Sequence, residues 1–340
     1  MNVTEHQRPG VYSVYDASSV VSGRSGSRAV GLAALCAQGT AGQVYSLFSR
    51  EQAAEIFGED AEITRLTGIL LKNGAASVRA VLAAEESGYA AAFSALEKAE
   101  ELAAVVCDST ALSVQQALRE SVKSASAARR ERLAVVCGAE GETASALVSR
   151  AESLNCERVV LAAPGGAGAA AAVAGAIAGE SDPAVPLGGA ELSGISPAEQ
   201  EWTDGEIDTL VLGGVTPLES SGGVVSVVRG VTTRTKTGAA ADATWRELTT
   251  VRVVDNVIPG LRDALRARFS RAKNTEQGRE AIRSQVIVEL EQKKSGEIIT
   301  GYDNVTVSAV EDNPTVCLVE FEFTVAHGLN QIWLSAHVTV

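Results

Sequence analysis

Apolar and polar residues alternate in a regular order through the middle of this chain. Between residues 77 and 180, short apolar runs alternate with longer segments whose apolar residues recur at helical spacing. Strands and helices in this order predict βαβ units around a parallel sheet. The runs are apolar throughout, as expected for strands covered on both faces. The predicted strands are 77–84, 102–109, 132–139 and 156–164, and the predicted helices are 88–100, 112–131, 142–154 and 167–180.

The flanks of this region carry weaker patterns. Residues 29–49 predict two strands around a glycine-rich turn, and two helices are expected between residues 50 and 74. Asn73-Gly74 should end the second of them, because glycine tolerates the backbone conformation that closes a helix. After residue 182 the pattern loosens as far as residue 218. A short helix is expected near Thr203, which forms a capping-box pattern with Glu206.

The last 120 residues follow a different pattern. Segment 222–236 predicts a strand, segment 243–269 a strand that leads into a helix, and segment 275–296 a second helix. Polar and apolar residues then alternate with period two, which predicts an antiparallel meander of half-buried strands. These strands are expected at 302–311, 315–328 and 330–340. In the second of them, one face should carry Phe321, Phe323 and Val325, and the other Glu320, Glu322 and Thr324.

Both ends of the chain are predicted to be strand-like arms. The first arm is preceded by Pro9-Gly10 and followed by the Ser/Gly-rich segment 22–27, which we interpret as a flexible tether. A short strand is not stable alone in water, and exposed strands pair readily with another chain. The residues expected to make the intersubunit strand are Val11, Tyr12, Val14 and Tyr15. The apolar side of the C-terminal strand is expected to be Ile332, Leu334, Ala336 and Val338.

Composition narrows the function classes. The 340 residues are 46% apolar but only 4% aromatic, so the cores should consist of small aliphatic side chains. The net charge of −13 argues against a nucleic-acid partner, which usually needs a basic surface. We expect no signal peptide and no direct membrane insertion, because the most apolar stretch, Ala167–Ala178, is too short for a spanning helix. The five cysteines show no metal-ligand spacing and predict a reduced environment.

One loop resembles an enzyme motif. Gly166-x-Gly168-x-x-Ala171 follows a predicted strand and opens a helix, as in dinucleotide-binding folds. However, it follows the last strand of the alternation, and the expected acidic residue is absent. We find no Walker A loop, no GxSxG elbow and no metal motif, so we expect no catalytic, cofactor-binding or metal-binding residues. An α/β nucleotide-binding enzyme using the Gly165–Ala171 loop remains the alternative hypothesis. A strand-exchanging secreted adhesin is disfavoured by the cysteines and the missing signal peptide.

Four stretches resemble one known family, the tail sheath proteins of contractile phage tails and R-type bacteriocin-like contractile injection particles. Arg8-Pro9-Gly10-Val11-Tyr12 is similar to the family's opening element, and residues 29–60 to the strands and helix that follow. Val227–Thr233 resembles its valine-rich strand ending in Arg-Gly-Val-x-Thr. Trp245–Leu248 and Val251–Asp255 resemble its Trp-x-Glu-Leu and Val-Arg-x-Val-Asp run. The Ala-rich middle of the chain departs from larger members, which carry outer insertions.

The resemblance implies a mechanical, non-enzymatic function. Sheath subunits stack as six-fold helical discs around an inner tube, and contraction drives the tube through a target cell envelope. Their expected partners are other copies of the chain, the inner tail tube protein, and baseplate and terminator proteins at the ends. Assembly would take place in the bacterial host cytoplasm, with release on lysis. The resemblance further implies that both terminal arms pair with the C-terminal domains of neighbouring subunits.

The predicted fold class is α/β, α+β overall, with an outer domain of parallel βαβ layers and an inner domain of antiparallel strands and two helices. The expected limits are 1–27 for the N-terminal arm and tether, 28–218 for the outer region, 219–330 for the inner domain and 331–340 for the C-terminal arm. Segment 260–283 is locally basic in an acidic chain. Part of it is hypothesised to face an acidic tube, although a solvated helix surface is an equal alternative. The proposed contact residues are Arg262, Arg266, Arg271 and Lys273.

Overall fold

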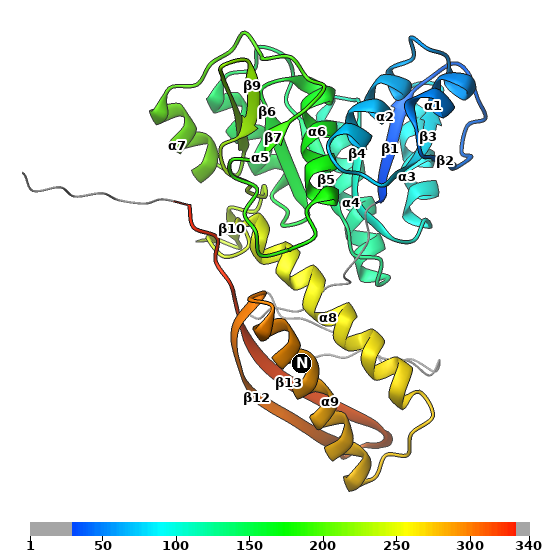
Figure 1. Ribbon diagram of the computed structural model, residues 1–340, viewed down its shortest axis with the longest axis vertical. Coiled ribbons are helices and arrows are strands. Elements are labelled where there is room, and N and C mark those ends of the chain that lie inside the picture. Colours follow the sequence, from blue (N-terminus) through cyan, green and yellow to red (C-terminus); the bar gives the residue numbers. More distant parts are fainter. Residues whose placement is uncertain (1–28, 331–340) are drawn as a thin grey trace, which may run out of the picture. The chain divides into compact units, whose positions relative to one another are not determined.

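A computed structural model describes residues 29–330, and its internal contacts separate into two compact units (Figure 1). Within the described chain, the large unit holds residues 29–180, 185–249 and 327–330. The small unit holds Ser181–Ala184 and Thr250–Ala326. The chain therefore passes between the units several times.

The large unit contains a nine-stranded sheet in the order β2-β3-β1-β4-β5-β6-β8-β9-β7. Its six central strands, from β3 to β8, are parallel, while β2, β9 and β7 pair antiparallel at the two sides. This confirms the predicted α/β class with a parallel sheet. The strands are β1 (Ala29–Leu35), β2 (Tyr45–Leu47), β3 (Ser77–Ala83), β4 (Leu102–Cys107), β5 (Leu133–Cys137), β6 (Val159–Ala163), β7 (Glu191–Leu192), β8 (Thr216–Ser221) and β9 (Val224–Val227).

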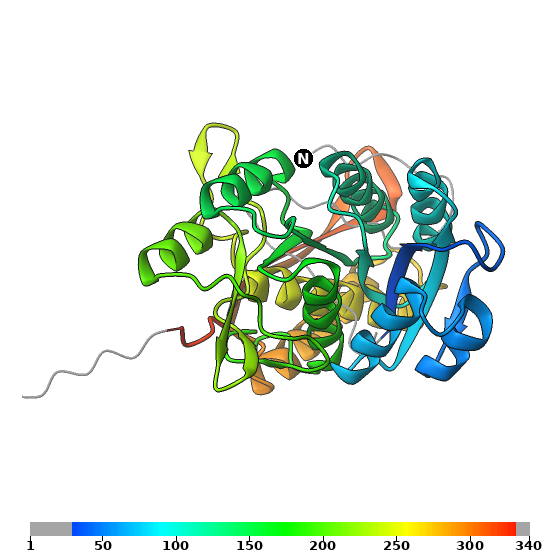
Figure 2. The same ribbon diagram turned by 90° about the horizontal axis from the view of Figure 1, so that it is seen from above.

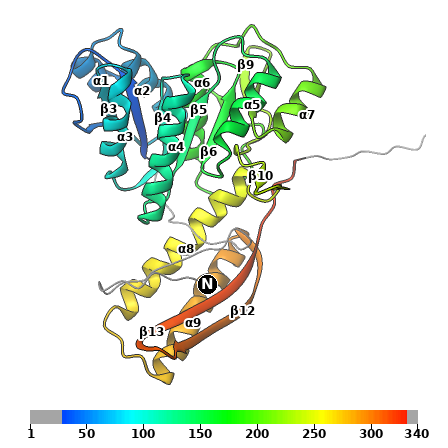
Figure 3. The same cartoon turned by 180° about the vertical axis from the view of Figure 1, so that it is seen from behind.

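Helices cover both faces of this sheet, as the views from the front, above and behind show (Figures 1, 2 and 3). Helices α2 and α6 pack side by side on one face, and α3, α4 and α5 lie on the other. All five residues of β5 are buried as a result, as are those of β6. The helices are α1 (Arg50–Phe57), α2 (Glu62–Lys72), α3 (Tyr89–Glu97), α4 (Leu112–Ala127), α5 (Ala144–Leu154), α6 (Gly166–Gly179) and α7 (Asp204–Leu212).

Two local signals are confirmed at atomic detail. Thr203 caps α7, and its side chain and that of Glu206 form the expected reciprocal capping box. Asn73 ends α2, and Gly74 follows with a positive φ of 109°. Both features satisfy backbone groups that a helix end would otherwise leave without partners.

The small unit is built from two helices and one hairpin. Helix α8 (Leu248–Phe269) and helix α9 (Glu276–Ser295) pack on the antiparallel strands β12 (Ile299–Val310) and β13 (Asn313–Val325). The core of this unit consists of aliphatic residues from all four elements: Val253, Val257, Leu261, Val286, Leu290, Ile299, Val305 and Val325. Phe321 and Phe323 pack against it, so the predicted apolar face of this strand is confirmed.

Three sequence predictions differ from the structure. The strand expected at the start of segment 243–269 is wrong, because Val251–Val254 lie in α8. Valine favours strands only weakly, and here Val253 and Val257 contribute one apolar stripe of a helix to the core. The strand expected over 222–236 is not continuous, because β9 covers only Val224–Val227 and β10 (Lys236–Thr237) begins at the last residue of the segment. Strand β8 was missed in the loosely patterned region that ends at residue 218.

Small residues in α6 permit its close approach to α2. A Cβ atom added at Gly175 would lie 2.7 Å from the Cβ of Asn73 and 2.7 Å from the carbonyl oxygen of Leu70. One added at Gly179 would lie 3.0 Å from the backbone of Asn73 and of Gly74. The alanine and glycine content of α6 is therefore explained by helix packing.

We expect Gly175→Val to destabilise the chain by about 2 kcal/mol, because the added side chain forces α2 and α6 apart. Chemical denaturation of the dilute, unassembled protein measures this. Gly205→Ala in α7 is the matched control, since an added Cβ there meets nothing within 4 Å. Equal stability of the Gly175 variant and the control would contradict this account of α6.

Candidate assembly surfaces

The hairpin of the small unit is an open two-stranded sheet. Within residues 29–330, β12 pairs only with β13, through a ladder from Ile299–Val325 to Val310–Asn313. The strands contain 12 and 13 residues, which is long for an edge strand. Near the turn, the side-chain amide of Asn274 donates hydrogen bonds to the carbonyl oxygens of Pro314 and Val316. No third strand of the described chain covers either edge.

The large sheet ends differently. Its two edge strands, β2 and β7, contain only three and two residues. Very short edge strands offer few backbone groups to another chain and are a common protection against unwanted pairing. The long open edges in the described part of the chain therefore belong to the small unit.

The predicted arms lie outside the described residues. This holds for the N-terminal set and for the C-terminal set, so their pairing stays a prediction. The residues concerned are Val11, Tyr12, Val14, Tyr15, Ile332, Leu334, Ala336 and Val338.

The basic segment 260–283 comprises the end of α8, a connecting loop and the first turns of α9. Arg262 is buried, whereas Arg266, Arg271 and Lys273 are exposed. Arg268 is also exposed and donates a hydrogen bond to the side-chain carbonyl oxygen of Gln285. The structure thus leaves three of the four predicted contact residues accessible to a partner.

The glycine-rich loop after β6 was the main candidate for a nucleotide site. Gly165 and Gly166 have positive φ angles of 115° and 61°, and α6 begins at Gly166. An added Cβ at Gly168 would lie 3.1 Å from Nη1 of Arg65, whose guanidinium is paired with Glu62. Two surface hollows of about 380 and 430 Å³ occur in this unit, and neither is lined by residues 165–171. The close approach of Gly168 to Arg65 gives this loop a role in the packing of α6 against α2.

The sheet also offers the position where doubly wound folds commonly bind ligands. The strand order reverses between β1 and β4, and Asp108 follows β4 there. Its carboxylate accepts hydrogen bonds from the hydroxyl of Tyr89 and, at 3.0 Å, from the backbone N–H of Leu35. Burial raises the pKa of Asp108. These contacts tie the ends of β1 and β4 together and point to a structural role.

The three buried cysteines are held as thiols. Burial raises the pKa of Cys107, that of Cys137 to about 12, and that of Cys156 to about 11. A raised pKa suppresses the reactive thiolate. Within residues 29–330, no group of His, Cys, Asp and Glu side chains is arranged to hold a metal ion. None of the helices in this range is long and apolar enough to cross a membrane.

Two motifs that are distant in sequence lie side by side in the large unit. Val231 forms an antiparallel bridge with Glu247, and the backbone N–H of Thr232 donates to the carbonyl oxygen of Arg246 at 2.8 Å. The guanidinium of Arg229 is paired with the carboxylate of Glu247, and these side chains are 30% and 18% exposed. Residues 229–232 and residues 246–247 thus form one contact, which we call the Arg229–Glu247 joint. It was not predicted from the sequence.

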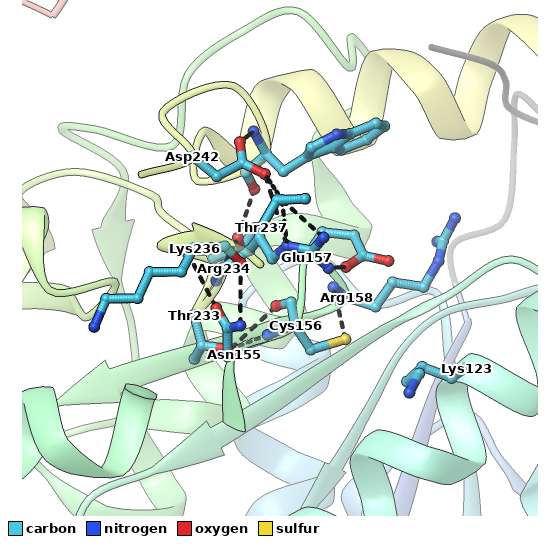
Figure 4. A network of polar contacts seen from close by, with 12 residues as sticks. Lys123, Asn155, Cys156, Glu157, Arg158, Thr233, Arg234, Lys236, Thr237 and Asp242 are labelled. Carbon is cyan, nitrogen blue, oxygen red and sulfur yellow. Dashed lines mark hydrogen bonds and ion pairs between the residues drawn. The ribbon is translucent and has the colours of Figure 1, made fainter. Parts of the chain in front are cut away.

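A polar network fastens this joint to the loop before β6 (Figure 4). The hydroxyl of Thr233 accepts a hydrogen bond from the backbone N–H of Cys156 and donates one to its carbonyl oxygen. Arg234 forms ion pairs with Glu157 at 3.0 Å and with Asp242 at 3.7 Å. Chain segments about 80 residues apart are fixed in this way immediately before α8 begins.

Comparison with known proteins identifies relatives of this chain. The family model described as the phage tail sheath protein central domain matches residues 83–233, and that of the phage tail sheath C-terminal domain matches residues 240–339. The tail sheath protein of Bacillus phage SP01 is 28% identical over 233 residues. That alignment covers 62% of this chain but only 38% of the relative, so the chain spans little more than a third of its length.

Solved structures share the fold. The helical sheath of the anti-feeding prophage in its contracted state superposes with a TM-score of 0.73 at 15% identity, over 98% of this chain and 99% of that one. The sheath tail protein of Desulfitobacterium hafniense gives 0.69 at 13% identity, over 93% and 100%. That of Listeria innocua gives 0.66 at 12% identity, over 91% and 97%.

We expect Glu247→Gln to destabilise the chain by about 1.5 kcal/mol, because it leaves the half-buried guanidinium of Arg229 without its charged partner. Denaturant unfolding of the dilute protein measures this. The control is Glu152→Gln, which breaks an ion pair with Lys236 whose side chains are about half exposed. Exposed pairs contribute little, so the control should change stability by less than about 0.5 kcal/mol. A larger loss in the control would refute the assignment.

Proposed function

The chain belongs to the family of phage tail sheath proteins, and on that premise we propose that it is the structural subunit of a contractile tail sheath. The relatives are sheath proteins rather than enzymes, so the nucleotide-binding alternative is not favoured. In this proposal, subunits stack as six-fold helical discs around an inner tube. Contraction of the sheath then drives the tube through a target envelope. Assembly takes place in the host cytoplasm, with baseplate and terminator proteins at the ends and release on lysis.

The observation that carries the proposal is the open hairpin β12–β13. An extended segment that adds to a sheet edge gains backbone hydrogen bonds along its whole length. Each such bond contributes only about 1 kcal/mol net, so a strand of several residues gives a modest contact that many copies reinforce. We propose that residues 11–15 and 332–338 of neighbouring subunits are the segments that add to these edges.

This mode of pairing suits an open array. A contact between two different surfaces of the same chain need not close into a dimer, and when it does not close it generates a ring or a helix. The arm and the hairpin are two different surfaces. The tether between the arm and β1 would let subunits reorient while the strand contacts persist.

The division into parts follows from this proposal. Residues 28–218 would form the outer body of the sheath and residues 219–330 the inner domain, with arms at 1–27 and 331–340; of the inner domain so defined, residues 219–249 fold with the large unit. The contracted lattice would bury more surface between subunits than the extended one. Such a bistable packing stores energy without any chemical reaction.

We assign the tube contact to the exposed cations Arg266, Arg271 and Lys273. They lie near the end of α8 and in the loop that follows it. None of the ion pairs found among the described residues involves these three side chains. Arg262 is buried and is left out of this surface. An acidic tube surface is the partner that this chemistry fits.

Strand addition by the N-terminal arm is tested with proline. The double variant Val11→Pro/Val14→Pro removes two backbone donors from the arm and should abolish tubes and rings in negative-stain electron microscopy. The control Val11→Thr/Val14→Thr changes the same two positions but keeps every backbone donor and a β-branched side chain, so it should leave assembly intact. Normal assembly of the Val11/Val14 variant would disprove the role of the arm.

The tube contact is tested by charge reversal. Arg266→Glu/Arg271→Glu should reduce the yield of sheathed tubes at least tenfold when the chain is produced together with its tail tube protein, because attraction becomes repulsion. The control is Lys98→Glu, which reverses an exposed cation of the large unit. Full yields of sheathed tubes from the Arg266/Arg271 variant would exclude these residues.

A further inference from the structure

The outward face of the hairpin β12–β13 carries unbalanced negative charge. The core lies on the other face, against α8 and α9. Figure 3 shows the strands in front of α9, as seen from the outward side. On that side, Asp303 stands directly opposite Glu322, and Glu320 stands opposite Thr306. All three acidic residues are exposed.

This arrangement is unfavourable in the isolated chain. Like charges directly opposite each other on a sheet destabilise it, whereas opposite charges in the same place stabilise it. Asp303, Glu320 and Glu322 form no ion pair with any described residue. The sequence from residue 295 to its last printed residue contains neither lysine nor arginine. The hairpin therefore supplies no cation of its own.

The matching charge lies in a segment outside the described residues. Between Asp16 and Glu51 the sequence contains no acidic residue, but it contains Arg24 and Arg28, which flank the serine- and glycine-rich end of the predicted tether. Residues 17–28 thus carry two positive charges and no negative charge, on the C-terminal side of the predicted arm strand.

We propose that the outward face of β12–β13 is a docking surface for this cationic tether, supplied by a second copy of the chain, with Arg24 and Arg28 placed against Asp303, Glu320 and Glu322. The proposal rests on the function proposed above, in which the arm of one copy adds to the hairpin edge of another. Once the strand formed by residues 11–15 is in place, the tether leaves it alongside this face.

The tether is long enough for this contact. Arg24 lies nine positions after Tyr15 in the sequence, and an extended chain of nine steps reaches about 30 Å. The acidic residues are close together, because Glu320 and Glu322 are two positions apart on one strand, about 7 Å. A single tether therefore spans the whole acidic cluster from a strand bound along the edge.

The charged contact would also fix the register of the added strand, which backbone hydrogen bonds alone do not determine. Backbone hydrogen bonds are the same at every position. An added strand can therefore shift by two residues and keep both its backbone pairing and the face of the sheet to which each side chain points. A charged contact at one end of the arm penalises the slipped positions. The tether would thereby fix the register of the arm and hence the spacing between subunits.

A charge-exchange experiment tests the proposal. The variants are Glu320→Gln/Glu322→Gln, Arg24→Gln/Arg28→Gln, and the exchange Arg24→Glu/Arg28→Glu with Glu320→Lys/Glu322→Lys. The measured quantity is the fraction of chain in sedimentable tubes at increasing sodium chloride concentration. Each neutralised variant should lose at least fivefold in tube fraction at low salt and show a flatter salt dependence. The exchange should restore both.

The matched control is Glu311→Gln/Asp312→Gln, which removes two acidic residues at the turn of the same hairpin and should assemble normally. A thermal melt of the dilute chain separates folding from docking. Glu320→Gln/Glu322→Gln should melt at the same temperature as the unaltered chain or higher, since a repulsion is removed, although its assembly is weaker.

Three results would overturn the proposal. The first is unchanged assembly of the neutralised variants, and the second is failure of the exchange to restore assembly. The third is restored assembly when Glu320→Lys/Glu322→Lys is combined with Arg266→Glu/Arg271→Glu and the tether is left unaltered. The last result would identify segment 260–283 of a second copy as the occupant. Normal assembly of Val11→Pro/Val14→Pro would refute strand addition itself. If Val11→Pro/Val14→Pro abolishes assembly but the neutralised variants assemble normally, the tether contact is refuted and strand addition is supported.

Discussion

Backbone hydrogen bonding at the edges of one hairpin is the constraint on which the proposed assembly depends. A polar backbone group that is removed from water must find a partner, and a strand edge presents a whole row of them. In the small unit, two strands of 12 and 13 residues meet only each other within the described chain. Two helices cover one face of this hairpin, and no third strand within residues 29–330 pairs with its edges. In the described part of the chain, the backbone groups along both edges of this sheet are therefore open to a further strand.

The large unit shows the opposite solution. Its parallel strands are covered by helices on both faces, and its two edge strands are too short to serve as templates. Close contact between α2 and α6 through Gly175 and Gly179 leaves no room for larger side chains. The joint of Arg229 and Glu247 and the network around Asn155 and Arg234 then fix the segment from which α8 departs. A body of this kind has little freedom to deform, because a closely packed interior has low compressibility.

Much of this fold was predictable because local and tertiary preferences agree. The buried parallel strands are apolar throughout, and caps such as Thr203 and Asn73 mark helix ends by chemistry that operates within a few residues. The predictions failed where the partner lies far away in the sequence. Val251–Val254 form a helix because the core of the small unit takes up their apolar stripe. The pairing of Arg229 with Glu247 depends on a tertiary contact between two segments, and no local sequence pattern predicts that contact. The open edges of the hairpin likewise emerge only from the strand order. The arms expected to pair with them stay a prediction from the sequence pattern and the family resemblance.

A sheath that changes its shape needs some contacts that last and others that change. Backbone ladders suit the first role, because they are short-ranged, tolerate any side chain and are insensitive to salt. Charged contacts suit the second, because they act at longer range, weaken with ionic strength and can exchange partners at little cost. In this chain the exposed cations at the end of α8 and in the following loop, and the acidic residues of the hairpin face, lie in the same unit as the open edges. If the edges hold neighbouring subunits together, the charges around them are positioned to decide in which register they do so. The mechanical properties of the assembly would then follow from the strand edges and exposed charges that the described part of the small unit offers to neighbouring subunits, rather than from any reactive site.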